Sequence, residues 1–310
     1  MADRHVTVFG GSGFLGREIV RRLAADGAEV RIAVRRPERA ASLTSCGRAG
    51  QITAVRADVW DAATVAPELA GADAVVNTVG HYVERGGASF DAIHGQGARH
   101  VAQAAADAGV RRLVHISGIG ADPASSSPYV CARATGERLV RAAFPTATIL
   151  RPSVMFGPGD FLDRLAGLAR VLPAMPLFGR GEVKLQPVHV TDVAAAVERA
   201  LALPEAEGKL YELGGPRIYP YRALVQLALG LSGRGRPLLP VPYAVWHALA
   251  AVTAPLPRRP ISRDQVKLME KDNVVSPGAL TLADLGITPA ALEAIAPTYL
   301  RGPRGGPPET

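Results

Sequence analysis

The sequence predicts an α/β protein of the Rossmann type, in which a doubly wound parallel sheet is followed by a smaller C-terminal lobe. Two observations lead to this prediction. Short apolar, β-branched runs alternate with longer segments of helical period, a pattern typical of a parallel sheet covered by helices on both faces. The first run leads directly into a glycine-rich turn, and an amphipathic segment follows that turn.

The strands and helices can be predicted in order along the first half of the chain. The expected strands are Val6–Phe9, Val30–Val34, Ile52–Val55, Ala74–Asn77, Leu113–Ile116 and Ala147–Leu150. The expected helices are Leu15–Ala25, Ala62–Leu69, Ala92–Ala108 and Ala132–Ala143. Right-handed crossovers between such strands give a doubly wound sheet, whose ligands bind at the carboxyl ends of the strands.

Proline becomes frequent after Arg151, and the alternation of strands and helices weakens. Residues 1–150 are therefore predicted to form a dinucleotide-binding core, and residues 151–300 to hold the remaining core elements and a lobe that faces a substrate or a partner. Residues 301–310 are rich in glycine and proline and are predicted to be a flexible tail. The apolar segment Tyr243–Ala254, which contains Trp246, is expected to be a short helix. We favour a buried core helix over one that docks on a surface.

The composition restricts the class of protein. Of the 310 residues, 48% are apolar and 20% charged, as in soluble globular proteins. The net charge of +7 suits an anionic ligand, an acidic partner or an anionic membrane surface, but the scattered basic residues do not indicate binding to nucleic acid.

Three sequence features bear on where the protein is located. The first predicted strand lies too close to Met1 for a targeting segment, and no apolar run reaches the roughly 18 residues that span a bilayer. Cys46 and Cys131 fit a reducing compartment. We expect a cytoplasmic protein, with a peripheral position at the inner face of the cell membrane as an alternative.

The glycine-rich turn is the first candidate for a functional site. It comprises Gly10, Gly11, Ser12, Gly13, Phe14, Leu15 and Gly16. The three glycines at 10, 13 and 16 allow a sharp turn, a close approach of the backbone to a pyrophosphate, and tight packing of the helix on the sheet. The free N–H groups and the positive end of the helix dipole then attract phosphate. We therefore expect this turn to bind a nicotinamide dinucleotide.

The residues that follow the next strands are expected to contact the adenosine half of that cofactor. Arg35 and Arg36 follow the second strand, where an NAD-selective site carries an acidic residue. Arginine can instead form charge-assisted hydrogen bonds with a 2′-phosphate, so NADP(H) is favoured over NAD(H), although two solvated arginines would give the same pattern. The residues after the third and fourth strands complete this set: Asp58, Val59, Thr78, Val79 and Gly80.

With these features the sequence resembles the extended and atypical branch of the short-chain dehydrogenase/reductase superfamily. The resemblance implies a serine after the fifth strand and a Tyr-x-x-x-Lys pair on the following helix. Ser117 and Tyr129 occupy the first two positions, but Arg133 replaces the lysine. In a working enzyme of this superfamily the tyrosine exchanges a proton with the substrate oxygen, the serine orients that oxygen, and the lysine holds the nicotinamide ribose and relays protons. Arg133 can lower the pKa of Tyr129 by its charge, but it cannot release a proton at working pH.

More specific segments resemble the NADPH-binding accessory subunits of respiratory complex I and their bacterial relatives. These segments are residues 144–160, 186–192, 211–215 and 264–273. The resemblance extends over most of the chain and implies a bound NADPH that is held as a structural element. It places Tyr129, Arg133, Pro152 and Ser153 around the nicotinamide half.

Two classes of function therefore remain open. The first, which we favour slightly, is an NADPH-containing accessory or redox-sensing protein linked to respiratory complex I (NADH:ubiquinone oxidoreductase), and it depends on the specific segments and on Arg133. The second is an NADP-dependent reductase, or an epimerase or dehydratase, acting on a small or quinone-like carbonyl compound. It depends on Ser117, Tyr129 and the intact glycine turn. No cluster of His, Cys, Asp and Glu has the spacing of metal ligands, so no metal is expected.

The remaining candidate residues have a structural interpretation as well as a functional one. Arg151 ends the sixth strand near the expected nicotinamide half, and a purely structural role is equally favoured. His81 and Tyr82 could face the pocket. His189 is expected to be a core histidine, and Asp192 to be the N-cap of the helix that follows it.

Overall fold

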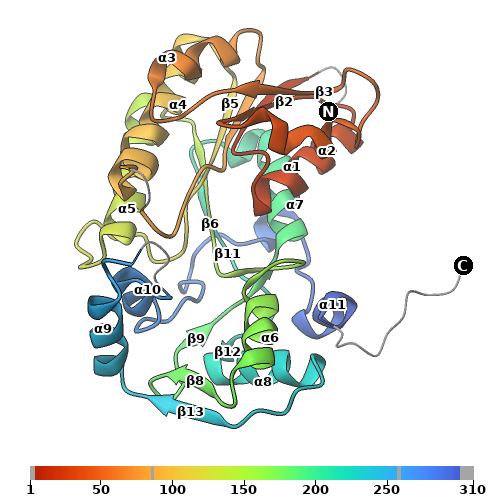
Figure 1. Ribbon diagram of the computed structural model, residues 1–310. Helices are drawn as coiled ribbons and strands as arrows, with labels where there is room; N and C mark the ends of the chain where they lie inside the picture. Colours follow the sequence, from red (N-terminus) through yellow and green to blue (C-terminus); the bar gives the residue numbers. More distant parts are fainter. Residues whose placement is uncertain (1–3, 85–86, 257–259, 301–310) are drawn as a thin grey trace, which may run out of the picture. The chain divides into compact units, whose positions relative to one another are not determined.

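The computed structural model describes residues 4–84, 87–256 and 260–300, and the predicted tail at 301–310 lies outside the described residues (Figure 1). The chain divides into two compact units. The first contains the chain up to residue 152 together with residues 190–213 and 276–288, and the second contains residues 153–189, 214–275 and those from 289 onward. Each unit is therefore assembled from separate segments of the chain.

The first unit is built on a parallel β-sheet. Within the described residues its strands are β1 His5–Phe9, β2 Glu29–Val34, β3 Ile52–Arg56, β4 Ala74–Asn77, β5 Arg112–Ile116, β6 Thr148–Pro152 and β11 Leu210–Leu213. They lie in the order β11-β6-β5-β4-β1-β2-β3, and every neighbouring pair is parallel. Because the direction of winding reverses between β1 and β4, the sheet is doubly wound, and the predicted fold class is confirmed. The edge strand β11 is not among the predicted strands.

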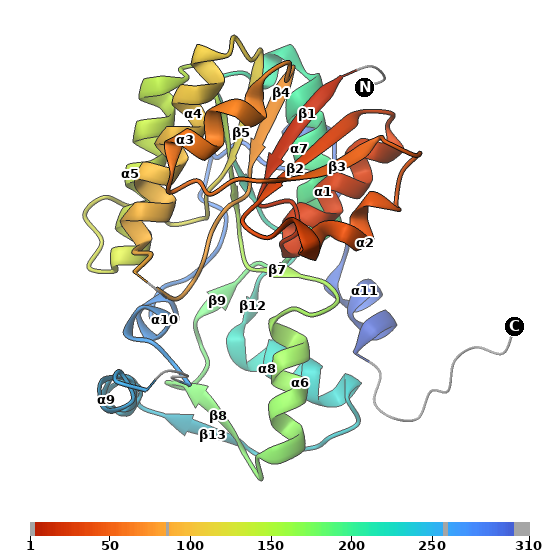
Figure 2. The same cartoon turned by 45° about the horizontal axis from the view of Figure 1, so that its top comes forward.

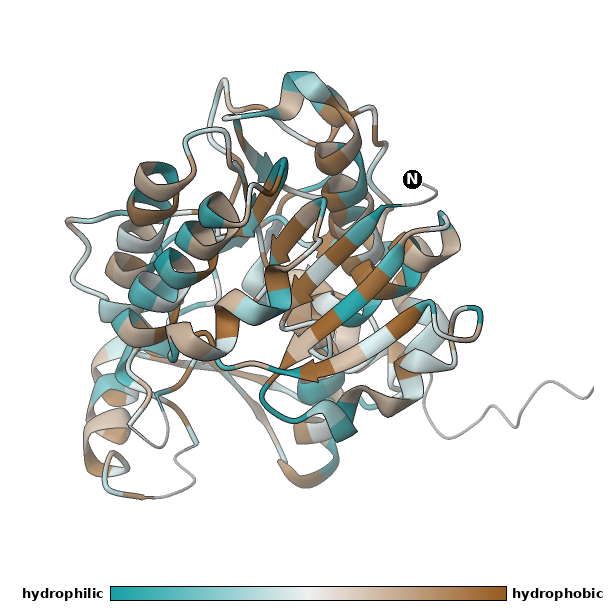
Figure 3. Ribbon diagram, turned by 90° about the horizontal axis from the view of Figure 1, so that it is seen from above, coloured by the Kyte–Doolittle hydropathy of each residue, from teal (hydrophilic) through white to brown (hydrophobic). Residues whose placement is uncertain are grey.

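Helices cover both faces of this sheet (Figure 2). One face carries α1 Phe14–Ala25, α2 Ala41–Thr44 and α7 Val190–Ala202, and the other carries α3 Ala62–Val65, α4 Ala98–Asp107 and α5 Pro128–Ala143. Because both faces are covered, β4 is buried along its whole length and β1 is buried from Val6 onward. Hydrophobic residues, brown in Figure 3, accordingly predominate in the central strands.

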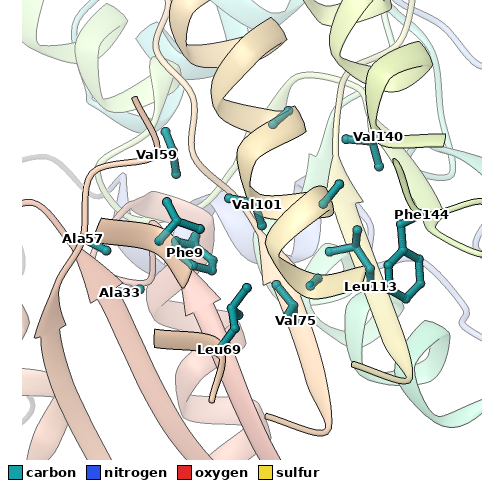
Figure 4. Packing of buried hydrophobic residues seen from close by; sticks show 14 of the residues in the cluster. Phe9, Ala33, Ala57, Val59, Leu69, Val75, Val101, Leu113, Val140 and Phe144 are labelled. Atoms are coloured by element: carbon teal, nitrogen blue, oxygen red, sulfur yellow. The ribbon is translucent and has the colours of Figure 1, made fainter. Parts of the chain in front are cut away.

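A hydrophobic core lies between the sheet and the helices α3, α4 and α5 (Figure 4). Phe9 and Val75 contribute to it from β1 and β4, while Val101 and Val140 contribute from α4 and α5. Full burial of such a side chain contributes about 1.5–3 kcal/mol. This packing fixes the strands, and therefore also the loops that follow their carboxyl ends.

The second unit contains short strand pairs and a group of helices. The pairs are β7 Met155–Phe156 with β10 Val188–His189, β8 Met175–Phe178 with β13 Leu238–Val241, and β9 Lys184–Leu185 with β12 Tyr219–Pro220. The helices are α6 Phe161–Val171, α8 Tyr221–Leu231, α9 Tyr243–Val252, α10 Arg263–Leu268 and α11 Leu292–Tyr299. A separate core, which includes Leu162, Met175, Leu177 and Leu224, holds this unit together.

Helix α9 lies at the surface of its unit, so the favoured prediction of a buried core helix is wrong. Trp246 turns inward, and its indole N–H donates a hydrogen bond of 3.1 Å to the carbonyl oxygen of Leu177. Val245, Leu249 and Val252 are 53%, 39% and 78% exposed. Among the described residues, no helix is both long enough and apolar enough to cross a bilayer.

Candidate functional site

The glycine turn joins β1 to α1 with almost no free space around its backbone. Gly10 adopts a φ of 79°, a left-handed conformation that strongly favours glycine. A Cβ atom on Gly10 would lie 2.8 Å from Thr78 Oγ1, and one on Gly16 would overlap the carbonyl oxygen of Gly10. The turn therefore requires glycine at both positions, and α1 can pack closely on the sheet for that reason.

The N-terminus of α1 is suited to bind an anion. Among the described residues, no side chain caps the helix at Gly13, and its first turn carries no acidic residue. Gly13 donates its N–H to Gly10 at 2.9 Å, and Arg17 donates its N–H to Gly13 at 3.1 Å, so the turn is ordered by its own backbone. The free N–H groups of the first helical turn and the positive end of the helix dipole therefore remain available for a phosphate group. Ser12 and Phe14 are half-buried beside them, and Leu15 is buried.

The residues after β2 and β3 lie at the same edge of the sheet as the glycine turn. Arg35 and Arg36 directly follow β2 and are exposed. Asp58 is half-buried after β3, and its Oδ1 accepts the N–H of Trp60 at 3.1 Å. Val59 is buried.

The loop after β4 passes close to the glycine turn. The hydroxyl of Thr78 donates a hydrogen bond of 3.0 Å to the carbonyl oxygen of Phe9, and this bond links the ends of β4 and β1. Val79 is half-buried and Gly80 is exposed. The residues predicted to contact the adenosine half thus follow strands β3 and β4, as the sequence places them. The two residues directly after β2, where an acidic side chain would bind the ribose 2′-hydroxyl, are arginines.

Ser117 follows β5 and is only 2% exposed. Its backbone N–H donates to Leu150 at 2.8 Å, but within the described residues its hydroxyl oxygen has no hydrogen-bond partner. Leaving a buried hydroxyl without a partner costs about 1–3 kcal/mol. A ligand that bonds this hydroxyl would remove that cost.

Tyr129 and Arg133 lie one turn apart on the same face of α5, as their i, i+4 spacing predicts. The Nε of Arg133 donates a hydrogen bond of 2.6 Å to the hydroxyl oxygen of Tyr129, and its guanidinium carbon lies 4.9 Å from the centre of the tyrosine ring. Tyr129 is 6% exposed. The two side chains therefore form a closed pair, in which the phenol oxygen already accepts a charge-assisted hydrogen bond.

Aromatic rings surround Tyr129 on several sides. Tyr82, Phe90 and His94 have ring centres 5.3, 5.4 and 5.3 Å from that of Tyr129. His94 lies on a π-helical turn, Asp91–Gly97, which leads into α4. A Cβ on Gly136 of α5 would overlap the carbonyl oxygen of His94, so this turn packs directly on α5.

Burial favours the neutral forms of Tyr129, His94 and His115 by shifting their pKa values. Burial raises the pKa of the Tyr129 phenol above its ordinary value, and this effect outweighs the charge of Arg133, which lowers the pKa. Burial also lowers the pKa of His94 well below its usual value and that of His115 on β5 to about 4. At neutral pH the Arg133 cation is therefore surrounded by a neutral phenol and neutral imidazoles.

Arg151 forms a largely buried ion-pair network with Glu137 and Glu212. Its Nε and Nη2 donate hydrogen bonds of 2.8 and 2.7 Å to the two carboxylate oxygens of Glu137, and its Nη1 lies 3.4 Å from Glu212 Oε1. The other oxygen of Glu212 accepts the N–H of Ser276 at 2.8 Å. The hydrogen bonds with Glu137 raise the pKa of Arg151. This network connects α5, β6 and β11, which favours the structural interpretation of Arg151.

Residues predicted near the nicotinamide half divide between the two units. Pro152 ends β6 in the first unit and is buried, and its carbonyl oxygen accepts the N–H of Ile119 at 3.2 Å. Ser153 begins the second unit, where its hydroxyl donates a hydrogen bond of 2.7 Å to Asn273 Oδ1. The hydroxyl of Ser153 is therefore bonded within its own unit.

Two further predictions concern the residues around the start of α7. His189 is half-buried, with its ring centre 5.0 Å from that of Phe156, so it lies at the border of a core and not within it. Asp192 is the third residue of α7, which begins at Val190, so the prediction that it is the N-cap is wrong.

The arrangement fits a dinucleotide. The winding of the sheet reverses between β1 and β4. On one side of this point, the glycine turn and the uncapped start of α1 follow β1. On the other side, the unpaired hydroxyl of Ser117 follows β5. Residues 10–202 match the model of a family described as NAD(P)H-binding. The chain belongs to this NAD(P)H-binding family.

Several curated relatives match nearly the whole chain, and another matches part of it. The 40 kDa subunit of mitochondrial NADH-ubiquinone oxidoreductase from Neurospora crassa is 33% identical over 96% of this chain and 79% of its own length. The mitochondrial NADH dehydrogenase (ubiquinone) 1 alpha subcomplex subunit 9 from Arabidopsis thaliana is 33% identical over 97% of this chain and 78% of its own length. A ceramide reductase from Caulobacter vibrioides is 34% identical over a shorter region, 61% of this chain and 58% of its own length. The predicted resemblance to complex I accessory subunits is thus confirmed.

Solved structures show the same fold at lower identity. The Citrobacter triphenylmethane reductase, complexed with NADP(H), has a TM-score of 0.75 at 19% identity over 95% of this chain and 99% of its own. The NADPH-dependent quinone oxidoreductase from Escherichia coli, complexed with NADPH, has a TM-score of 0.74 at 20% identity with the same coverage. These two structures share the fold of this chain.

Sequence reasoning missed the π-helical turn and the rings that it contributes, Phe90 and His94. A pattern that could have indicated it is the presence of Gly95, Gly97 and Gly136 inside predicted helices, where glycine is unfavourable unless two backbones approach closely. The ion-pair partners of Arg151 had no comparable pattern.

Proposed function

We propose that this protein is an NADPH-holding accessory protein of respiratory complex I, and that it retains its nucleotide without turning over a substrate. The observation that carries the proposal is the closed pair of Tyr129 and Arg133. A tyrosine that acts as an acid or base needs a pKa near the working pH and a partner that can pass on a proton. Tyr129 has a raised pKa, is buried under aromatic rings, and accepts its hydrogen bond from a guanidinium that does not deprotonate.

The roles of the other residues follow from their positions. The N–H groups at the start of α1 would bind the pyrophosphate, and the hydroxyl of Ser117 would bond the nicotinamide half. Bound NADPH supplies a hydride donor, but a hydride acceptor also needs a proton source beside it. The names of the curated relatives, which are subunits of NADH-ubiquinone oxidoreductase, support the assignment to complex I.

The nucleotide content of the purified protein tests this proposal. We expect about one NADPH per chain on native mass spectrometry, slow exchange with added nucleotide, and no oxidation of NADPH with a panel of carbonyl compounds and quinones. The Tyr129→Phe variant should retain its nucleotide, because the phenol oxygen is not needed to hold the phosphates.

The second candidate function, an NADP-dependent reductase or epimerase, is favoured by the buried, unpaired hydroxyl of Ser117, the residue that the superfamily resemblance assigns to the same site as Tyr129. It would replace the first if the wild-type protein oxidises NADPH with any member of that panel and if Tyr129→Phe abolishes this turnover while the nucleotide stays bound.

We propose that the cofactor is NADPH rather than NADH, because the cationic pair Arg35 and Arg36 follows β2 where an acidic residue would select NAD. The double variant Arg35→Gln/Arg36→Gln should weaken NADPH binding by about tenfold to a hundredfold, since a hydrogen bond to a charged group contributes about 1.5–3 kcal/mol. Binding of NADH, which lacks the 2′-phosphate, should change little. Titration calorimetry with both nucleotides measures this, and an equal loss for both would show that the arginines only add general positive charge. Arg39→Gln, an exposed arginine on the next turn, is the matched control.

We further propose a cytoplasmic location at the inner face of the cell membrane, with the exposed side of α9 as the contact surface. Val245, Leu249 and Val252 form an apolar stripe, because they recur at the spacing of one helix face. Trp246 is a poor probe of this surface because its indole is bonded inward. If α9 carries the contact, Val252→Asp should reduce co-purification with complex I subunits and leave the nucleotide content unchanged. Association with anionic vesicles that also falls in this variant would instead identify the membrane as the contact.

A further inference from the structure

The position of the Arg133 guanidinium has a consequence for the cofactor that is independent of catalysis. The guanidinium lies close to two glycines that follow neighbouring strands. A Cβ on Gly80, after β4, would be 3.7 Å from Arg133 Nη2, and one on Gly118, after β5, would be 3.5 Å from Nη1. A Cβ on Gly80 would also lie 2.9 Å from His94 Cε1, so the absence of a side chain at the two glycines lets the guanidinium and the His94 ring approach the ends of β4 and β5.

The topology of the sheet indicates which half of a dinucleotide would occupy that place. The phosphates lie at the glycine turn after β1, and the adenosine half extends toward β2 in folds of this topology. The nicotinamide half then extends the other way, over β4 and β5, because these strands continue the sheet on the other side of β1. The Arg133 cation lies beside the glycines that follow both strands.

Within the described part of the chain, the carboxylate that acts on this cation is already paired with another arginine. The carboxylate whose field reaches Arg133 is Glu137, and both oxygens of Glu137 are already bonded to Arg151. The other titratable groups that face Arg133 are Tyr82, Tyr129, His81, His94 and His115, and burial favours the neutral forms of Tyr129 and of the three histidines by shifting their pKa values. Glu84 and Arg35 act on His81. The charge of Arg133 therefore acts on any ligand placed over β4 and β5.

We propose that Arg133 makes this site selective for the reduced form of the cofactor. The nicotinamide ring of NADP⁺ carries a positive charge, whereas the dihydronicotinamide ring of NADPH is neutral, and the phosphates are the same in both. A fixed cation beside the ring therefore disfavours the oxidised form alone. This inference depends on the proposed NADPH site, and it states in addition that the site selects the reduced cofactor over the oxidised one.

The choice of arginine over lysine gives the selectivity a distinct pH behaviour. A lysine in this partly buried, aromatic position would have a lowered pKa and would lose its charge as the pH rises through that pKa. Arginine stays charged at every working pH. The selectivity of the wild-type protein should therefore be independent of pH above neutrality, where His94 and His115 are already neutral.

The test compares the dissociation constants of NADPH and NADP⁺ by titration calorimetry, using the full chain stripped of nucleotide. We expect the wild-type protein to bind NADPH about tenfold or more tightly than NADP⁺, which would raise the midpoint potential of the bound couple by about 30 mV per factor of ten. Arg133→Met should bring the ratio of the two constants close to one. Arg138→Met, at an exposed position of the same helix, should leave the ratio unchanged.

Arg133→Lys serves as the second variant, because it keeps the positive charge even if the methionine variant folds poorly. We expect a ratio near that of the wild type at pH 7 and a progressive loss between pH 7 and 9.5, while the wild-type ratio stays constant. Equal affinities for the two redox forms in the wild type, or an unchanged ratio in Arg133→Met, would overturn the inference. Failure of both nucleotides to bind would instead contradict the proposed function itself.

Discussion

Replacing Gly16 with alanine is expected to abolish measurable nucleotide binding, with an affinity loss of about a hundredfold or more. The added Cβ would overlap the carbonyl oxygen of Gly10 and the Cα of Gly11, which are backbone atoms that cannot rotate away. The helix α1 must then shift away from β1, and the N–H groups at its start move with it. Overpacking of this kind also destabilises the fold by about 1–3 kcal/mol.

The control for this variant is Gly167→Ala. Gly167 also lies inside a helix, α6, but a Cβ there would meet no atom within 4 Å. Alanine should therefore stabilise the protein by about 0.4–1 kcal/mol through its helix preference and the reduced freedom of the unfolded chain. Binding is measured by calorimetry and stability by urea denaturation. Retention of full affinity by Gly16→Ala would show that the phosphates are not bound by the end of α1.

Replacing Arg151 with methionine is expected to lower the free energy of unfolding by about 3–5 kcal/mol. Glu137 and Glu212 are 4% and 5% exposed, so the change leaves two buried carboxylates without their cation. Denaturation midpoints measure the loss. Because the three groups share one network, the double variant Arg151→Met/Glu137→Gln should lose less than the sum of its single changes.

The ion pair between Arg111 and Asp73 provides the comparison, since the Arg111 side chain is 78% exposed. Such surface pairs contribute about 0–1 kcal/mol, so Arg111→Met should change stability little. If Arg151→Met costs no more than Arg111→Met, the buried network is not a stabilising element, and Arg151 is again available for a role in binding.

The sequence was sufficient to predict the central strands and the glycine turn, because each depends on a local pattern. β1 and β4 are buried on both faces and contain runs of apolar residues, and the turn is specified by three glycines at fixed spacing. The i, i+4 spacing of Tyr129 and Arg133 likewise predicts that the two side chains meet. The contact observed between them agrees with that pattern.

What could not be predicted depends on contacts between distant residues. The pKa of Tyr129 is set by burial under Tyr82, Phe90 and His94, and this outweighs the effect of Arg133 that the spacing indicates. The partners of Arg151 lie on α5, 14 residues before it, and on β11, 61 residues after it, and no periodic pattern connects them. β11 is short and contains the charged residue Glu212, so its sequence does not read as a buried strand. Glu212 can be buried there because it pairs with Arg151.

The late position of β11 in the chain has a consequence for biosynthesis. During translation the strands up to β6 emerge well before β11, which pairs with β6 through Leu210–Leu213. Until those residues leave the ribosome, the hydrogen-bonding edge of β6 is open, and an open edge strand can pair with other chains. The nascent protein thus passes through a stage in which aggregation can compete with folding, and this stage ends only after Leu213 has been made.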